Sequence, residues 1–78
     1  MVKEIVDNLR AIRVANKISQ EELARATGVS QKHISNIENH KDTPTIETLQ
    51  KLARGLGVEI SLKLLDKNHI EADALPRN

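Results

Sequence analysis

The sequence predicts a mainly α-helical domain of four to five helices, followed by one short β-strand. In four segments the apolar residues recur every three or four positions, which is the spacing of a helix with one buried face. After Gly57 the spacing changes to strict alternation, which is typical of a half-buried strand. We therefore expect a helical domain over residues 1–57, a dimerisation strand over 58–65 and a flexible C-terminal tail over 66–78.

The composition limits both the core and the chemistry. The 78 residues include no Phe, Tyr, Trp or Cys, so we expect a core of Ile, Leu, Val and Ala without disulfides or thiolate metal sites. A core of this size supplies only about 3–5 kcal/mol, which favours association with a second copy. The sequence contains no apolar run of membrane-spanning length and opens with no signal-peptide pattern, so we expect a cytoplasmic protein that does not contact a membrane.

The first helix is expected over residues 2–15, where Ile5, Leu9 and Ile12 recur at helical spacing. Ser19 is a good N-cap for a second helix over residues 20–27, and Glu22 completes a capping box. Gly28 is expected to end that helix, because glycine adopts a left-handed backbone conformation at little cost.

A third helix is expected over residues 30–39, capped by Ser30 and packed inward through Ile34 and Ile37. Its outward side carries side chains that can hydrogen-bond base edges or phosphates, namely Gln31, Lys32, His33, Ser35 and Asn36. Gln31 suits adenine N6 and N7, and Lys32 suits guanine O6 and N7. Asn36 lies one turn further and can reach a base or the sugar-phosphate, whereas His33 and Ser35 are secondary candidates.

The fourth helix begins after a loop at residues 40–44. Either Thr45 caps it, or Thr43 does, with Pro44 as its first residue. Its expected buried stripe consists of Ile46, Leu49, Leu52, Ala53 and Leu56.

The expected strand has no partner elsewhere in the chain. Its apolar positions are Val58, Ile60, Leu62 and Leu64. A lone strand leaves its backbone donors and acceptors unpaired, so the simplest solution is antiparallel pairing with the same strand of a second copy across a two-fold axis. The alternatives are that the fourth helix continues past Gly57, or that the segment packs as coil.

Charge and motifs exclude several function classes. The net charge is only +1, so DNA binding would depend on a local patch formed by Lys32, Lys41 and the capped N-terminus of the third helix. The three histidines (His33, His40 and His69) have no metal-ligand spacing. The sequence also lacks a glycine-rich phosphate loop and a nucleophile elbow, so we expect neither a cofactor nor an enzyme.

Three runs of residues resemble the helix-turn-helix of the Cro/C1-type (XRE) DNA-binding proteins. They are Ser19-Gln20-Glu21-Glu22-Leu23-Ala24, Gly28-Val29-Ser30-Gln31 and Ile34-Ser35-Asn36-Ile37-Glu38-Asn39. The resemblance implies a lambda-repressor-like DNA-binding domain whose third helix reads the major groove. One departure concerns the loop, because His40 stands where the family usually has glycine.

The resemblance also implies roles for residues outside the reading face. Gln20 matches the position that touches the DNA backbone and braces the recognition helix, and Asn39 and Lys41 match phosphate-contacting positions. Arg13 and Glu38 match a structural ion pair that ties the first helix to the end of the third.

The join Leu56-Gly57-Val58-Glu59-Ile60-Ser61-Leu62-Lys63-Leu64 is similar to the HipB-type antitoxins. That likeness implies a homodimer that reads an inverted-repeat operator in double-stranded DNA, represses its own operon and binds a HipA-type kinase toxin. The chain lacks the C-terminal tryptophan of that group. The alternatives are a stand-alone regulator without a toxin, including a monomeric Cro-like one, and an interaction adaptor that has lost DNA binding.

Overall fold

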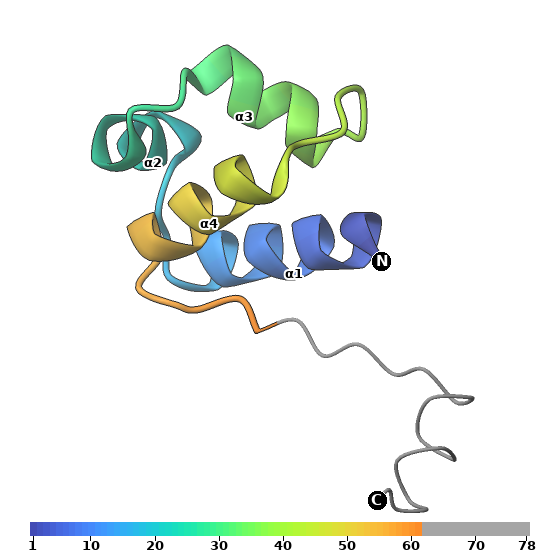
Figure 1. The fold of residues 1–78 in the computed structure, drawn as a ribbon. Coiled ribbons are helices and arrows are strands. Elements are labelled where there is room, and N and C mark those ends of the chain that lie inside the picture. The colour runs from blue at the N-terminus through green and yellow to red at the C-terminus, as the bar shows by residue number, and fades with distance from the viewer. Residues whose placement is uncertain (62–78) are drawn as a thin grey trace, which may run out of the picture.

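A computed structural model describes residues 1–61 and contains the four expected helices (Figure 1). They are α1 (Val2–Ala15), α2 (Gln20–Thr27), α3 (Gln31–Glu38) and α4 (Ile46–Gly55). The predicted mainly α class is confirmed, and no strand occurs within residues 1–61. Half of the expected strand, residues 62–65, and the expected tail, residues 66–78, lie outside the described residues.

The caps that the sequence predicts set the ends of the three later helices. Ser19 accepts a hydrogen bond from the Glu22 backbone N–H, and the Glu22 side chain accepts one from the Ser19 N–H, so the capping box is complete. Gly28 ends α2 in the left-handed region with φ 79°. Of the two candidates for the fourth helix, Thr45 is the cap, and it accepts from the Thr48 N–H at 3.1 Å.

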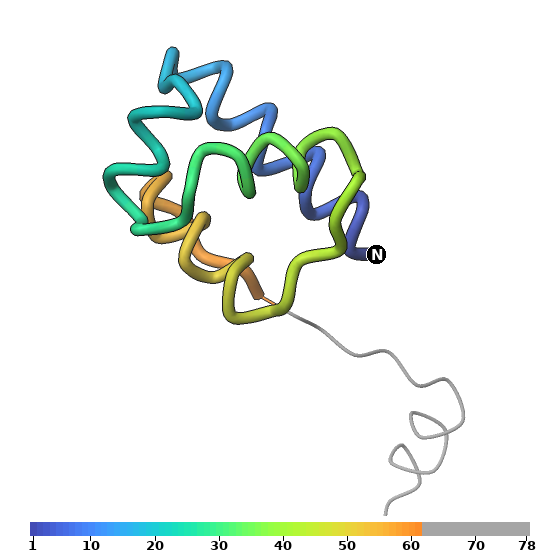
Figure 2. The backbone as a smooth tube through the Cα atoms, turned by 90° about the horizontal axis from the view of Figure 1, so that it is seen from above, coloured from blue at the N-terminus to red at the C-terminus, as the bar shows by residue number. Residues whose placement is uncertain are grey.

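The core is entirely aliphatic, and α3 contributes its most deeply buried residues, Ile34 and Ile37. The buried set is Val6, Leu9, Leu23, Val29, Ile34, Ile37, Leu49, Leu52 and Ala53. Seen from above, α3 lies in front of the other helices, with α1 behind it on one side and α4 behind it on the other (Figure 2). The prediction that Ile46 is buried is wrong, because its side chain is 56% exposed. It is the first residue of α4, one turn before the part of that helix that packs on its neighbours.

Helix α4 approaches α2 closely at one point. A Cβ atom placed on Gly55 would come within 3 Å of the Thr27 side chain, so only glycine fits there without a shift of one helix. The Thr27 hydroxyl donates to the Leu23 carbonyl and accepts from the Val29 N–H, which holds this side chain in the corner between α2 and α3. The last turn of α4 is therefore fitted against the helix that precedes α3.

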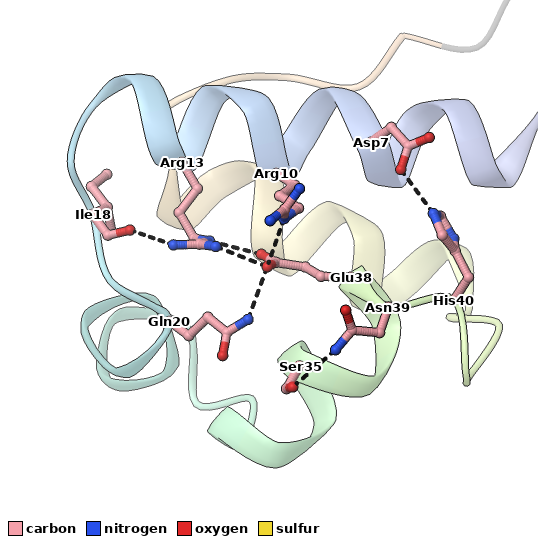
Figure 3. Close-up of polar contacts among 9 residues, drawn as sticks. All are labelled: Asp7, Arg10, Arg13, Ile18, Gln20, Ser35, Glu38, Asn39 and His40. Carbon is pink, nitrogen blue, oxygen red and sulfur yellow. Dashed lines mark hydrogen bonds and ion pairs between the residues drawn. The ribbon is translucent and has the colours of Figure 1, made fainter.

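The segment after α4 does not continue the helix. Gly57 adopts φ 76°, and the Val58 N–H donates to the Ala53 carbonyl, which turns the chain away from α4. Val58 and Ile60 are partly buried against the core, whereas Glu59 and Ser61 are exposed, so the predicted alternation holds as far as the structure describes it. Residues 58–61 run along α1 on the side opposite α3 (Figures 1 and 3).

Candidate nucleic-acid interface

The outward side of α3 presents a stripe of polar side chains. Lys32, Ser35, Asn36 and Asn39 are spaced at i, i+3, i+4 and i+7, which places them on one face of a helix. Lys32 and Asn39 are exposed, and Ser35 and Asn36 are partly buried. Because Ile34 and Ile37 fix the opposite face in the core, this stripe points away from the protein.

Three further candidates lie at the beginning of α3. Gln31 is exposed on the first turn, and His33 is partly buried at the edge of the stripe. The Ser30 side chain accepts a hydrogen bond from the His33 backbone N–H at 3.1 Å. Ser30 therefore caps the helix, and its position brings the positive end of the helix dipole to the same surface.

The end of α3 is joined to the following loop. The backbone N–H of Lys41 donates to the Asn36 carbonyl at 2.8 Å, and that of Asp42 donates to the same oxygen at 3.3 Å. Asn39 Nδ2 donates to Ser35 Oγ at 3.4 Å (Figure 3). The first two bonds fix the backbone of Lys41 at the last turn of α3, so the two candidate phosphate contacts, Asn39 and Lys41, both lie at the C-terminal end of the stripe.

The Glu38 carboxylate connects α3 to both preceding helices (Figure 3). Arg13 Nε donates to Glu38 Oε2 at 2.7 Å, and its Nη2 donates to Oε1 at 2.9 Å. Gln20 Nε2 also donates to Oε1, at 2.9 Å. The side chains of Arg13 and Glu38 are only 11% and 8% exposed, so this is a largely desolvated, two-pronged ion pair.

Arg13 makes one more contact that fixes the chain between α1 and α2. Its Nη1 donates to the Ile18 carbonyl at 2.7 Å. The neighbouring Lys17 has φ 58°, a conformation that non-glycine residues adopt at some cost. One guanidinium thus holds both the turn before α2 and the end of α3.

Opposing effects act on the pKa of Glu38. Burial of the carboxyl would raise its pKa, but the hydrogen bonds from Arg13 and Gln20, together with the charges of Arg13 and Arg10, outweigh that effect. The pKa therefore lies below the ordinary glutamate value, and Glu38 is ionised at neutral pH.

Sequence reasoning missed two contacts in this region. Arg10 Nε lies 3.7 Å from Glu38 Oε1, and His40 Nε2 lies 2.8 Å from Asp7 Oδ1 (Figure 3). The three-residue spacing of the two arginines on α1 was a signal for the first contact, since both then face the same neighbour. The second holds the α3–α4 loop to α1, and His40 has the positive φ (60°) that glycine would adopt freely. Among residues 1–61, no cluster of three His, Asp or Glu side chains is placed to hold a metal ion.

Comparison with known proteins identifies the family. The helix-turn-helix family model matches residues 9–63, which is most of the chain and includes α2 and α3. The chain belongs to the Cro/C1-type (XRE) helix-turn-helix family. Membership places it among the helix-turn-helix DNA-binding regulators.

Several curated XRE relatives align with the chain. The uncharacterized HTH-type transcriptional regulator y4dL of Sinorhizobium fredii is 43% identical over 77% of this chain, which spans only 31% of that relative. Antitoxin HipB of Escherichia coli is 31% identical over 91% of this chain and 78% of its own length. Control protein C.SmaI of Serratia marcescens is 34% identical over 90% of this chain and 83% of its own length. No solved structure matches the chain significantly.

None of the helices that the structure describes is long and apolar enough to cross a membrane.

Replacing Glu38 with glutamine tests the role of the carboxylate. In Glu38→Gln, the amide NH2 takes the place of one carboxylate oxygen, so a donor faces a donor of Arg13 or Gln20 and the negative charge is lost. We therefore expect the free energy of unfolding at neutral pH to fall by about 2–3 kcal/mol. The folded pKa of Glu38 is lower than the unfolded one, so its contribution is full above the ordinary glutamate range and is lost as pH falls through the folded pKa. The variant should therefore lose less stability than the wild type between neutral pH and about pH 3.

Urea denaturation followed by circular dichroism measures both effects. Glu59→Gln is the matched control, because Glu59 is exposed and makes no ion pair with another described residue. Equal stability of Glu38→Gln and wild type at neutral pH would show that the carboxylate does not hold the helices together.

Proposed function

We propose that this chain is a sequence-specific transcriptional repressor that binds an inverted-repeat operator in double-stranded DNA as a homodimer. The observation that carries the proposal is the polar stripe of α3, whose opposite face is buried through Ile34 and Ile37 and whose end is fixed through Glu38. A recognition helix needs such a rigid support, because base edges are distinguished only by side chains held in register with the groove.

The proposed reading face combines base and backbone contacts. Gln31 at the first turn reads adenine, Lys32 reads guanine, and Asn36 reaches a base or the sugar-phosphate one turn later. Ser35 and His33 lie at the margins of this set and have secondary roles. Since Ser35 is hydrogen-bonded to Asn39, it also sets the direction of that side chain.

The proposed backbone contacts surround the stripe. Gln20, at the beginning of α2, braces Glu38 and contacts the DNA backbone through its remaining amide groups. Asn39 and Lys41 contact phosphates at the far end, and the N-terminus of α3 at Ser30 attracts one at the near end. A net charge of +1 is sufficient if these groups act together on one surface.

The proposed dimer forms through residues 58–65. Apart from the Val58 N–H, the backbone groups of residues 58–61 make no backbone hydrogen bond to another described residue, so their donors and acceptors are available to a second chain. Antiparallel pairing across a two-fold axis would satisfy them, with recognition helices about 34 Å apart on successive major grooves.

The finer proposal is that the protein is the antitoxin of a type II toxin–antitoxin pair, which autoregulates its operon and binds a HipA-like kinase toxin. The alignment with antitoxin HipB supports it, because it covers 91% of this chain and most of that antitoxin. A protein of this kind works on DNA in the cytoplasm and needs no catalytic site. The proposed domain plan is a DNA-binding domain over residues 1–57, the dimerisation strand and a C-terminal tail over 66–78.

A stand-alone regulator is the second candidate. Control protein C.SmaI aligns over a similar share of both chains, and its name does not refer to a toxin. An adaptor that has lost DNA binding is a third candidate, supported only by the low net charge. These candidates differ in their partners, so binding experiments separate them.

Removing two of the reading side chains should greatly reduce sequence preference without affecting the dimer. We expect Gln31→Ala combined with Asn36→Ala to lose most of the wild-type preference for the operator over random duplex, because two of the three proposed contacts to base edges are lost while Lys32 and the phosphate contacts remain. Anisotropy of labelled DNA measures the preference, and light scattering measures the mass. Gln50→Ala, an exposed glutamine of α4, is the control.

The same titrations test the adaptor. Operator binding by a repressor weakens several-fold or more as salt rises, because several phosphates per dimer are neutralised. An undiminished, wild-type preference in the double variant would mean that another surface reads DNA, and no binding at low salt would favour the adaptor.

A charge at an apolar position of the segment after α4 should split the dimer. Ile60→Glu places a carboxylate where the side chain is partly buried, so we expect light scattering to show half the wild-type mass. Ser61→Glu adds the same charge on the exposed alternate position and should leave the mass unchanged. A wild-type mass for a folded Ile60→Glu, or a monomeric wild type, would rule out the strand-paired dimer.

Purification from the native cell separates the antitoxin from the stand-alone regulator. With an N-terminal tag, an antitoxin should retain a stoichiometric kinase-like protein, identified by mass spectrometry and encoded next to it. Recovery of the tagged chain with only itself would contradict the antitoxin role and support a plain dimeric repressor.

A further inference from the structure

Two arginines of α1 approach the same carboxylate but differ in how many of their N–H donors are already used in hydrogen bonds. Arg13 uses Nε, Nη1 and Nη2 in hydrogen bonds within the protein, and its side chain is 11% exposed. The Arg10 side chain is 59% exposed, its Nε lies 3.7 Å from Glu38 Oε1, and the side chain makes no hydrogen bond to another described residue. All five N–H donors of Arg10 are therefore available to a ligand.

The charge of Arg10 is also in excess. The two-pronged bond from Arg13 already balances the negative charge of Glu38, which is the only carboxylate within 4 Å of Arg10 among residues 1–61. The acid one turn earlier on α1, Asp7, is bonded to His40. A guanidinium with a neutralised neighbour and unused donors is suited to an anion that accepts two parallel hydrogen bonds.

The position of Arg10 indicates which anion its side chain would bind. Arg10 Nε and Gln20 Nε2 both lie within 4 Å of the same oxygen of Glu38, so the guanidinium sits beside the first turn of α2. In Figure 3, Arg10 extends from α1 to the Glu38 carboxylate, with Gln20 on one side of that carboxylate and Asn39 on the other. Gln20 and Asn39 are two of the backbone contacts of the proposed interface, and Arg10 meets the same carboxylate near them.

We propose that Arg10 binds a phosphate of the operator, which extends the DNA interface from the helix-turn-helix onto α1. This inference rests on the proposed DNA-binding function. Glu38 has a second role in it: without DNA its carboxylate keeps the Arg10 side chain near the phosphate path, which reduces the entropy lost when the complex forms. The contact is independent of base sequence, so it adds affinity and fixes the position of the protein without adding specificity.

The salt dependence of binding measures the contact. The probe is a short duplex that the wild-type protein selects from a random library. Each neutralised phosphate adds about 0.9 to the slope of log affinity against log salt, so Arg10→Gln should reduce the slope by about 1.8 for a dimer. Affinity at low salt should fall about tenfold or more, and the ratio of operator to random duplex should stay unchanged.

Two further variants separate a DNA contact from a general effect of charge. Lys51→Gln removes a positive charge from the exposed side of α4, next to Ala26 and Thr27, and should keep the wild-type slope. Arg10→Lys keeps the charge but loses the planar pair of donors, so it should keep most of the slope and lose part of the affinity. An unchanged slope in Arg10→Gln would overturn the inference while leaving the proposed function intact. If the wild type selects no duplex, the proposed function fails and the inference fails with it.

A measurement on the wild-type protein covers the case in which Arg10→Gln does not fold. The Nε–Hε resonance of Arg10, assigned by its loss in Arg10→Lys, should shift when the selected duplex is added. The corresponding resonance of Arg54, on the exposed side of α4, should stay in place. A stationary Arg10 resonance in the presence of saturating duplex would overturn the inference.

Discussion

The placement of α3 depends on one largely desolvated carboxylate. Glu38 is the last residue of α3, and it accepts hydrogen bonds from Arg13 of α1 and Gln20 of α2. Burial of Leu, Ile and Val has little directional preference, so a small aliphatic core fixes the angle of a helix less sharply than a directed polar contact does. The carboxylate adds direction, since losing either partner would leave a buried charge without its donors. The XRE domain therefore combines a small core, which supplies burial, with one polar junction that sets the angle of α3.

Features determined by local sequence were predicted well. The capping box at Ser19, the left-handed Gly28 and the burial of Ile34 and Ile37 all follow from spacing within one helix or turn. The ion pair of Arg13 with Glu38 was implied by family resemblance, and local pattern alone would not have supplied it, because the two residues are 25 positions apart. Ile46 was misplaced because periodicity shows which side of a helix is apolar but does not show where its neighbours stop covering it.

The missed contacts share a physical cause. Arg10 with Glu38 and Asp7 with His40 join α1 to residues 28 and 33 positions further along the chain, so they exist only once the helices are packed. The departure from glycine at His40 was visible in the sequence, but the bond to Asp7 that accompanies its positive φ was not. For residues 58–61 the alternation of apolar and polar residues identified the core-facing side. The same alternation does not distinguish a strand that pairs with a second chain from a segment that packs only on its own domain.

The absence of aromatic residues, in the core and elsewhere, also determines the absorbance and fluorescence of the protein. Without Tyr or Trp the chain has almost no absorbance at the usual protein wavelength and no intrinsic fluorescence. In a mixture with any protein that contains tryptophan, the whole emission signal comes from that other protein. Complex formation can therefore be followed without a label, through the change in the partner's own spectrum against a dark background.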